Sequence, residues 1–326
     1  MKSDCYTYTG NIELECGQAL AGVTFAYATY GQLNKAGDNV IFVCHALTAN
    51  ADVKDWWPGM VGEGLVFDTH KYFVVCANVL GSCYGTTGPS EINPVTNQAY
   101  GSSFPAITIR DIVKGHQLLA KHLGINAIEL VCGGSLGGQQ AMEWAIIEPG
   151  FIKKLFVIAT NARHSAWGIA FNEAQRMAIE AGDKGLEAAR AIAMLSYRNY
   201  NMYSETQTDN DARTDNFSAA TYQRYQGEKL KKRFNAASYS VLSKAMDSHH
   251  VGRGRKSAAE ALSTILAKTL VTGITSDLLF PVSEQQFLAK YIPDAVYTEI
   301  DSRYGHDGFL IETKTISELL RVYLNI

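Results

Sequence analysis

The sequence predicts an α/β fold with a mostly parallel, doubly wound sheet and an inserted helical segment. Short β-rich hydrophobic runs recur along the chain, and segments with amphipathic helical spacing lie between them. Nearly uninterrupted hydrophobic runs are typical of parallel strands that are covered on both faces. Their alternation with helices predicts an open sheet with helices on both sides. The runs span residues 40–44, 72–76, 128–132, 155–159, 269–273 and 295–300, and the intervening helices include residues 109–123 and 139–147.

The strand pattern stops in the middle of the chain. Residues 165–267 are polar and helical in spacing, and no strand is evident among them. We therefore expect a core made of residues 1–164 and 268–326, with residues 165–267 inserted as a helical lid. A weak alternation over residues 12–15 and 23–30 predicts an antiparallel hairpin before the first run. The candidate lid helices span residues 171–181, 185–197 and 238–248.

Charge and composition are those of an ordinary globular protein. The 326 residues are 47% hydrophobic and 19% charged, with a formal net charge of −3, which suits one large α/β domain. Because nucleic-acid binding requires a concentrated basic surface, this balance argues against a nucleic-acid partner. Two short basic runs, residues 229–233 and 253–256, are flanked by acids or glycines. We interpret both runs as solvated helix faces or turns.

The sequence favours a cytoplasmic protein without a membrane partner. The first residues lack the apolar segment of a secretory signal, and no apolar run reaches the roughly 18 to 20 residues that cross a bilayer. Six cysteines are scattered without a C-x-x-C pair, so we expect reduced thiols. Cys132 lies close to Ser135 in the sequence, but a buried strand position makes it a poor nucleophile.

The sharpest local motif is Gly133-Gly134-Ser135-Leu136-Gly137, directly after one hydrophobic run and directly before one helical segment. In that context G-x-S-x-G predicts a strained strand-to-helix turn that exposes the Ser135 hydroxyl. The helix N-terminus beneath it favours negative charge. We therefore identify Ser135 as the candidate nucleophile of an acyl-transfer or hydrolytic enzyme.

A serine nucleophile needs a base, and the base needs an acid to orient it. Asp277 follows the run at 269–273, and His306 follows the run at 295–300, so both are expected at carboxyl ends of strands. The order Ser, Asp, His is that of the α/β-hydrolase fold, which we take as the fold class. Asp301 is the rival acid, but it precedes His306 too closely to occupy a separate loop. We interpret His116 and His122 as surface helix residues.

The oxyanion hole requires two preorganised N–H donors. We expect one from Leu136, the residue after the nucleophile, and the other from Leu47, in the loop after the run at 40–44. His45 precedes Leu47 in that loop, and we interpret it as bracing the turn rather than acting in catalysis. No H-E-x-x-H motif or Cys/His cluster at ligand spacing predicts a metal site.

Together with these motifs, segments spread over nearly the whole chain resemble the homoserine O-acetyltransferase family, whose members have the α/β-hydrolase fold and act in methionine biosynthesis. The segments include VCHALT at 43–48, NVLGSCYGTTGPS at 78–90, INP at 92–94, GGSLGG at 133–138, AFNEAQR at 170–176, RYQG at 224–227, SDLLFP at 276–281 and GHD at 305–307. They include part of the lid and are far more specific than the serine turn alone.

The resemblance implies a ping-pong transfer from acetyl-CoA, through an acyl ester on Ser135, to the hydroxyl of L-homoserine. It implies that Arg198, in the lid, binds the substrate carboxylate and that Asp307 binds the substrate amine, with Arg224 and Arg176 as alternatives to Arg198. A fixed cation and a fixed anion would orient a zwitterionic substrate. The resemblance further implies a homodimer formed through lid helices, an entry tunnel under the lid, and no cofactor beyond acetyl-CoA itself.

Three other functions fit the same motifs. A homoserine O-succinyltransferase or a serine O-acyltransferase would keep the triad and change a substrate, with Arg176, Arg224 or Lys54 as the cation for a succinyl carboxylate. An esterase would use water as the acceptor. A catalytically inactive scaffold is disfavoured because no member of the triad is missing. One departure from the family is the short segment at residues 180–185, between the first two lid helices, which bears on the tunnel mouth and the acyl donor.

Overall fold

The computed structural model describes residues 1–326, and the centre of the molecule is one eight-stranded sheet. β1 pairs with β2, and β2 with β6, in antiparallel fashion, while all other neighbours are parallel. The mostly parallel sheet and the N-terminal hairpin are thus confirmed. In spatial order the strands are β1 (Lys2–Glu13), β2 (Ala19–Tyr30), β6 (Phe73–Ala77), β3 (Val40–Cys44), β7 (Ile128–Gly134), β8 (Lys154–Ile158), β9 (Lys268–Ile274) and β10 (Val296–Ile300).

Both faces of the sheet are buried, which explains its uninterrupted hydrophobic strands. On β3, Val40 and Phe42 belong to a core cluster that includes residues of α2, α3 and α10. Ile41 and Val43 point to the opposite face and belong to a second cluster with Trp57 and residues near the C-terminus. Because successive strand residues alternate between faces, a strand buried on both sides needs apolar side chains at every position.

The helices fall into a core set and an inserted set. None of them combines the length and the apolar character that a bilayer-crossing helix requires. The core set is α1 (Val53–Trp56), α2 (Ile109–His122), α3 (Leu136–Ile147), α10 (Val282–Tyr291), α11 (Gly308–Ile311) and α12 (Thr313–Leu319), with short η1 (Gly101–Ser103), η2 (Gly305–Asp307) and η3 (Leu320–Leu324). The inserted set, between β8 and β9, is α4 (Ala166–Glu180), α5 (Gly185–Tyr197), α6 (Tyr200–Gln207), α7 (Ser218–Lys231), α8 (Ala236–Asp247) and α9 (Ala258–Ser263).

Element positions agree closely with the sequence patterns where burial is strong. The strand at 40–44 and the helix at 185–197 have the expected bounds. The sequence patterns missed α6, α7 and the small β4 (Val61–Gly62) and β5 (Phe67–Asp68) pair. Met202 is the single buried residue of α6, and α7 buries only Gly227 and Leu230. With so little burial, neither helix carries the apolar stripe that periodicity detects.

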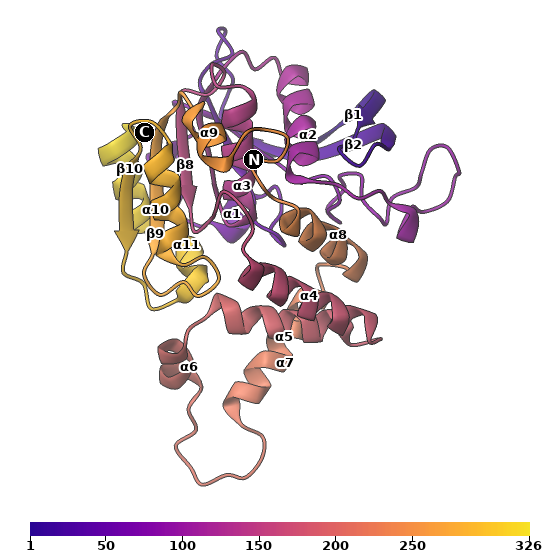
Figure 1. Ribbon diagram of the computed structural model, residues 1–326, viewed down its shortest axis with the longest axis vertical. Coiled ribbons are helices and arrows are strands. Elements are labelled where there is room, and N and C mark those ends of the chain that lie inside the picture. The colour runs from indigo at the N-terminus through magenta and orange to yellow at the C-terminus, as the bar shows by residue number, and fades with distance from the viewer.

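Residues 165–267, which we call the lid, are attached to the core through two paired chain segments. The His164 N–H donates to the carbonyl of His249 at 3.0 Å, and the Val251 N–H donates to the carbonyl of Ala162 at 2.9 Å. Figure 1 shows α4 to α7 gathered at one end of the molecule, below the sheet in that view. The chain therefore enters and leaves α4 to α8 through one neck beside the core, formed by residues 162–164 and 249–251, while α9 packs in the core cluster.

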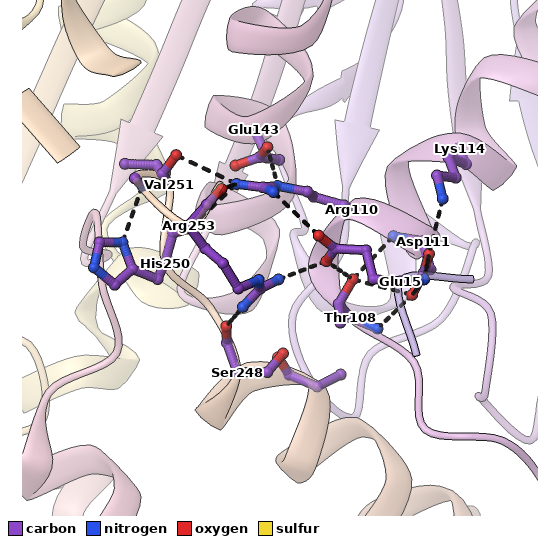
Figure 2. A network of polar contacts seen from close by, with 12 residues as sticks. Glu15, Thr108, Arg110, Asp111, Lys114, Glu143, Ser248, His250, Val251 and Arg253 are labelled. Atoms are coloured by element: carbon purple, nitrogen blue, oxygen red, sulfur yellow. Dashed lines mark hydrogen bonds and ion pairs between the residues drawn. The ribbon is translucent and has the colours of Figure 1, made fainter. Parts of the chain in front are cut away.

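A polar network ties this neck to the core (Figure 2). Arg253 pairs with Glu15 at 2.5 Å, and Arg255 pairs with Glu143 at 2.6 Å. Arg110 from α2 reaches both acids, at 3.1 Å and 2.7 Å. The expectation of a solvated turn at 253–256 is therefore wrong for Arg253 and Arg255. For Arg255 the cause is Glu143, which is 1% exposed, because a buried carboxylate must be paired with cations to remain charged. Arg253 is held by its ion pair with Glu15, whose side chain is only partly buried.

Candidate active site

Ser135 occupies a sharp turn between β7 and α3. Its backbone lies at φ 57° and ψ −127°, a strained conformation that costs about 1 to 3 kcal/mol in a non-glycine residue. A Cβ on Gly137 would lie 2.0 Å from the Cys44 carbonyl oxygen, and one on Gly133 would lie 2.8 Å from that oxygen. Both positions must therefore be glycine, so that the turn can pack against the end of β3.

Two hydrogen bonds to the Ser135 backbone hold the turn in place. The Ser135 N–H donates to the carbonyl of Ile158 at 3.1 Å, and the Thr160 hydroxyl donates to the Ser135 carbonyl at 2.8 Å. Leu136 begins α3, and the first amides of a helix have no intrahelical acceptor. The Leu136 N–H is thus free to bind an oxyanion.

Asp277 and His306 form a buried acid–base pair. The loop after β9 carries Asp277, and η2, after β10, carries His306. The His306 Nδ1 lies 2.7 Å from Asp277 Oδ2, and the N–H groups of Leu279 and Phe280 donate to Asp277 Oδ1 at 2.8 and 2.9 Å. With Nδ1 bound to the carboxylate, Nε2 is the ring atom left for proton transfer.

The rival groups lie elsewhere. Asp301 is exposed and accepts a hydrogen bond from the Thr275 hydroxyl at 3.1 Å. Burial raises the pKa of the Cys132 thiol well above its ordinary value, so this thiol stays protonated and unreactive. His122 is exposed as expected, but His116 is 2% exposed and faces the side-chain oxygen of Gln140 at 2.9 Å. The surface interpretation of His116 is therefore wrong, because α2 turns that side chain toward α3.

One cavity of about 330 Å³ is lined by both Ser135 and His306. Leu47 and Asp307 line it as well. Hollows of about 620 and 770 Å³ lie elsewhere and include neither Ser135 nor His306, so chemistry rather than size identifies the site. No group of three or more His, Cys, Asp or Glu side chains is arranged to hold a metal ion.

Arg198 and Asp307 lie against each other beside this cavity. The Arg198 Nη2 is 3.1 Å from Asp307 Oδ2, while its Nε and Nη1 are buried without a partner. Asp307 lines the cavity, whereas Arg198 does not and reaches it only through Asp307; its alternatives Arg176 and Arg224 neither line the cavity nor contact Asp307. Arg176 pairs with Asp247 at 2.6 Å, and Arg224 is exposed. An unpartnered, buried guanidinium edge is costly unless a ligand completes it.

Three further cations line the cavity that the sequence reasoning had not placed there: Arg190, Lys229 and Arg233. Lys229 and Arg233 bound the basic run at 229–233; both are exposed, as expected of a solvated face, and both also line the cavity. Lys229 lies in the last turn of α7, and Arg233 lies in the turn that follows the helix. The sequence could not show that these side chains reach the cavity of Ser135, because that depends on how α7 packs on α5.

Comparisons with known proteins agree with this fold. The family model of the alpha/beta hydrolase fold matches residues 39–313. The homoserine O-acetyltransferase of Cyclobacterium marinum is 46% identical over 323 residues, covering 96% of this chain and 92% of that protein. The crystal structure of the homoserine O-acetyltransferase from Bacillus anthracis superposes with a TM-score of 0.91 at 25% identity, covering 100% and 98% of the two chains. Esterase E22 reaches a TM-score of 0.90 at 23% identity, covering 99% of each chain, a likeness of fold alone.

Proposed function

Since the chain belongs to the homoserine O-acetyltransferase family, we propose that it transfers the acetyl group of acetyl-CoA to the hydroxyl of L-homoserine, in methionine biosynthesis. The observation that carries the proposal is the strained Ser135 in one cavity with His306, whose Nδ1 is held by Asp277 at 2.7 Å. This is the arrangement that activates a serine for acyl transfer.

In the first half-reaction Ser135 is acylated. His306 Nε2 accepts the Ser135 hydroxyl proton while Oγ attacks the thioester carbonyl. The resulting oxyanion accepts hydrogen bonds from the N–H groups of Leu47 and Leu136, which stabilise charge that exists only in and near the transition state. The carbon–sulfur bond then breaks, and His306 returns the proton to the CoA sulfur. These steps need no cofactor beyond the acyl donor.

In the second half-reaction the acceptor hydroxyl replaces the thioester. His306 takes the proton of that hydroxyl as its oxygen attacks the acetyl-serine carbonyl. The same two N–H groups stabilise the second oxyanion. The ester bond to Ser135 then breaks, His306 returns the proton to the serine oxygen, and O-acetylhomoserine leaves.

The Arg198–Asp307 pair orients the acceptor. A zwitterionic amino acid offers one anion and one cation, and the pair offers the opposite charges 3.1 Å apart. The substrate amine binds Asp307, and the substrate carboxylate binds the free edge of Arg198, whose Nε and Nη1 have no protein partner. Fixing both ends restricts the hydroxyl to the neighbourhood of the acyl ester.

The cations of the cavity support a phosphorylated acyl donor. Arg190 lies over the Tyr197 ring at 5.3 Å, and Arg233 donates to the Thr48 hydroxyl at 3.3 Å. Neither contact neutralises a positive charge, and Lys229 lines the same cavity. Uncompensated cations beside a nucleophile attract an anionic substrate such as CoA.

The same cations keep a succinyl donor as the nearest alternative. The cations first considered for a succinyl carboxylate, Arg176, Arg224 and Lys54, do not line the cavity. Arg190, Lys229 and Arg233 do, so they replace them in that alternative. Steady-state assays that cross acetyl-CoA and succinyl-CoA with homoserine and serine distinguish the four pairs. We expect acetyl-CoA with homoserine to have the highest kcat/KM, and a hundredfold preference for succinyl-CoA would overturn the donor assignment.

Intact-mass spectrometry tests the covalent step. After mixing with acetyl-CoA and no acceptor, the wild-type chain should carry one acetyl group that peptide mapping places on Ser135. Ser135→Ala should carry none and should lose the burst of free CoA. Cys132→Ala is the matched control, because it removes the buried thiol that lies three residues before Ser135 and should take no acetyl group, and it should be acetylated like the wild type. An adduct on the Ser135→Ala chain would contradict the proposal.

Hydrolysis is the second candidate function, since water could replace homoserine at the same acyl ester. The likeness to esterase E22 concerns the fold, while the Arg198–Asp307 pair favours an amino-acid acceptor. With p-nitrophenyl acetate as donor, homoserine should accelerate turnover several-fold. Rapid hydrolysis that homoserine does not accelerate would favour the esterase.

We further propose that residues 165–267 act as a lid over the acyl donor and that lid helices form a homodimer in the cytoplasm. Large apolar side chains are exposed there, including Trp167, Met177 and Leu195, and exposed apolar patches often mark protein interfaces. All six cysteines are free, which suits a reducing compartment. Sedimentation equilibrium should give twice the chain mass, and Met177→Asp combined with Leu195→Asp should give the monomer.

A further inference from the structure

The loop that carries Leu47 is held by a histidine that takes no part in proton transfer. The carbonyl of Ala46 faces His45 Nδ1 at 2.8 Å and accepts from the Ala49 N–H at 3.0 Å. In a trans peptide the C=O and the N–H point in opposite directions, and the chain has no cis peptide bond. The two donors on the Ala46 oxygen therefore also fix the direction of the Leu47 N–H.

The tautomer of His45 follows from its other contact. The Val79 N–H donates to His45 Nε2 at 3.1 Å, so Nε2 is the acceptor and Nδ1 carries the proton. The side chain is fully buried, and burial lowers the pKa of His45 to about 4. The ring is thus neutral at neutral pH, and its Nδ1–H donates to the Ala46 carbonyl at all times.

Gln140 joins the two halves of the proposed oxyanion hole. Its side-chain Nε2 donates to the carbonyl of His45 at 3.1 Å and to the carbonyl of Leu136 at 3.1 Å. The same side chain accepts, through Oε1, the contact with His116 Nε2 at 2.9 Å, which fixes the orientation of the amide. One buried amide therefore bonds to both the Leu47 loop and the start of α3.

We propose that His45 and Gln140 are positioning residues for acyl transfer: His45 sets the direction of the Leu47 N–H, and Gln140 sets its separation from the Leu136 N–H. The inference rests on the proposed function, since it concerns the oxyanion of that reaction. Oxyanion stabilisation depends on donors that are already aimed at the developing charge. Neither side chain needs to touch the substrate to affect the rate.

The test measures the rate constant of the CoA burst, the KM values and the thermal stability of four variants. His45→Phe removes both ring contacts, whereas His45→Asn keeps an N–H close to the position of Nδ1. Gln140→Met removes the bridging donor at similar volume. His249→Phe is the control, because His249 is 3% exposed and contacts the carbonyl of Asn161 at 3.0 Å, away from this loop.

We expect the burst rate constant to fall about 10- to 100-fold in His45→Phe and Gln140→Met, less than the 10²- to 10³-fold cost of deleting an oxyanion donor. The KM for homoserine should stay within twofold, and His45→Asn should recover most of the rate. His249→Phe should lose stability without losing burst rate. If His45→Phe does not fold, the comparison of Gln140→Met and His45→Asn with the control decides the question.

The result that overturns the inference is a burst rate constant in Gln140→Met and the His45 variants equal to that of the control. Recovery of the rate no better in His45→Asn than in His45→Phe also overturns the role of the Nδ1–H. Acetylation of the wild-type chain distinguishes a failure of this inference from a failure of the proposed function. A wild-type chain that takes no acetyl group refutes the function itself, whereas an acetylated wild type with unaffected variants refutes only the positioning role.

Discussion

The core edge and the lid contribute to the same cavity in different ways. At the core edge, short side chains are fixed by the backbone: Ser135 by its turn, and Asp277 by two N–H donors and His306. The lid contributes long cationic side chains, and Arg198 leaves two buried nitrogens without a partner. The core therefore holds its catalytic geometry before substrate arrives, whereas the lid presents an incomplete site that a substrate completes. The chemical step of acylation should depend on the core, donor binding on the lid cations Arg190, Lys229 and Arg233, and acceptor choice on Arg198.

The largest expected effect comes from breaking the core geometry at Gly137. In Gly137→Ala the new Cβ would lie 2.0 Å from the Cys44 carbonyl oxygen, so β3 and α3 must separate. We expect loss of the folded protein, or a Tm lowered by more than 10 °C together with loss of the CoA burst, since such a clash costs several kcal/mol. Circular dichroism melting and the burst assay measure both.

Gly150→Ala is the matched control for Gly137→Ala. No atom lies within 4 Å of the position its Cβ would take, so its Tm should change by no more than about 2 °C, as expected for an open surface position. A Gly137→Ala protein with native Tm and native burst would show that neither folding nor acylation depends on the close approach of the start of α3 to the end of β3.

The same contrast explains how much could be predicted from the sequence. The catalytic residues at the core edge could be predicted because their sequence signals are local: a serine between glycines after a strand, then an aspartate and a histidine after later strands. The sheet could be predicted for the same reason, because strands buried on both faces are hydrophobic throughout. The positions of Ser135, Asp277 and His306 at strand ends followed directly from these patterns.

The site residues of the lid were harder to predict from the sequence, because their positions depend on packing between helices. The side chains of α6 and α7 are mostly exposed, so no periodic stripe marks these helices. That the exposed Lys229 also lines the cavity depends on the contact of α7 with α5, which leaves no local sequence pattern. The pairing of Arg253 with Glu15 joins residues far apart in the chain and is likewise invisible to spacing.

The next largest effect is expected at Arg198, where a substitution in the lid should change acceptor binding without changing acylation. Arg198→Ala removes the guanidinium and leaves Asp307 without its partner at 3.1 Å. We expect the KM for homoserine to rise about 100-fold, or about 3 kcal/mol, as for a charged hydrogen-bonded pair that loses one member. The CoA burst without acceptor should stay within twofold of the wild type.

Arg224→Ala controls for the loss of a lid cation, because Arg224 is exposed and, unlike Arg198, has no ion pair with Asp307. Its KM for homoserine should be that of the wild type. An unchanged KM in Arg198→Ala would remove Arg198 from the acceptor site and make Arg190 the next candidate. A burst lost in Arg198→Ala would instead show that the lid also shapes the acylation step.

The smallest expected effect compares how acid destabilises the core and the lid neck. Burial lowers the pKa of His116 in the core to about 4 and that of His249 in the neck to about 3, from 6.5. Between pH 6.5 and these values the two histidines bind protons in the unfolded chain but not in the folded chain. The free energy of unfolding is therefore unaffected by these histidines above pH 6.5 and falls as the pH is lowered, with a slope of up to about 1.4 kcal/mol per pH unit for each histidine.

Urea unfolding measured from pH 7 to pH 4 should show this slope reduced by about one proton in His249→Phe. Because the Arg253 and Arg110 network ties the neck to the core, unfolding should remain one transition. Two transitions at low pH, with the lid unfolding first, would show that the neck is held independently of the sheet.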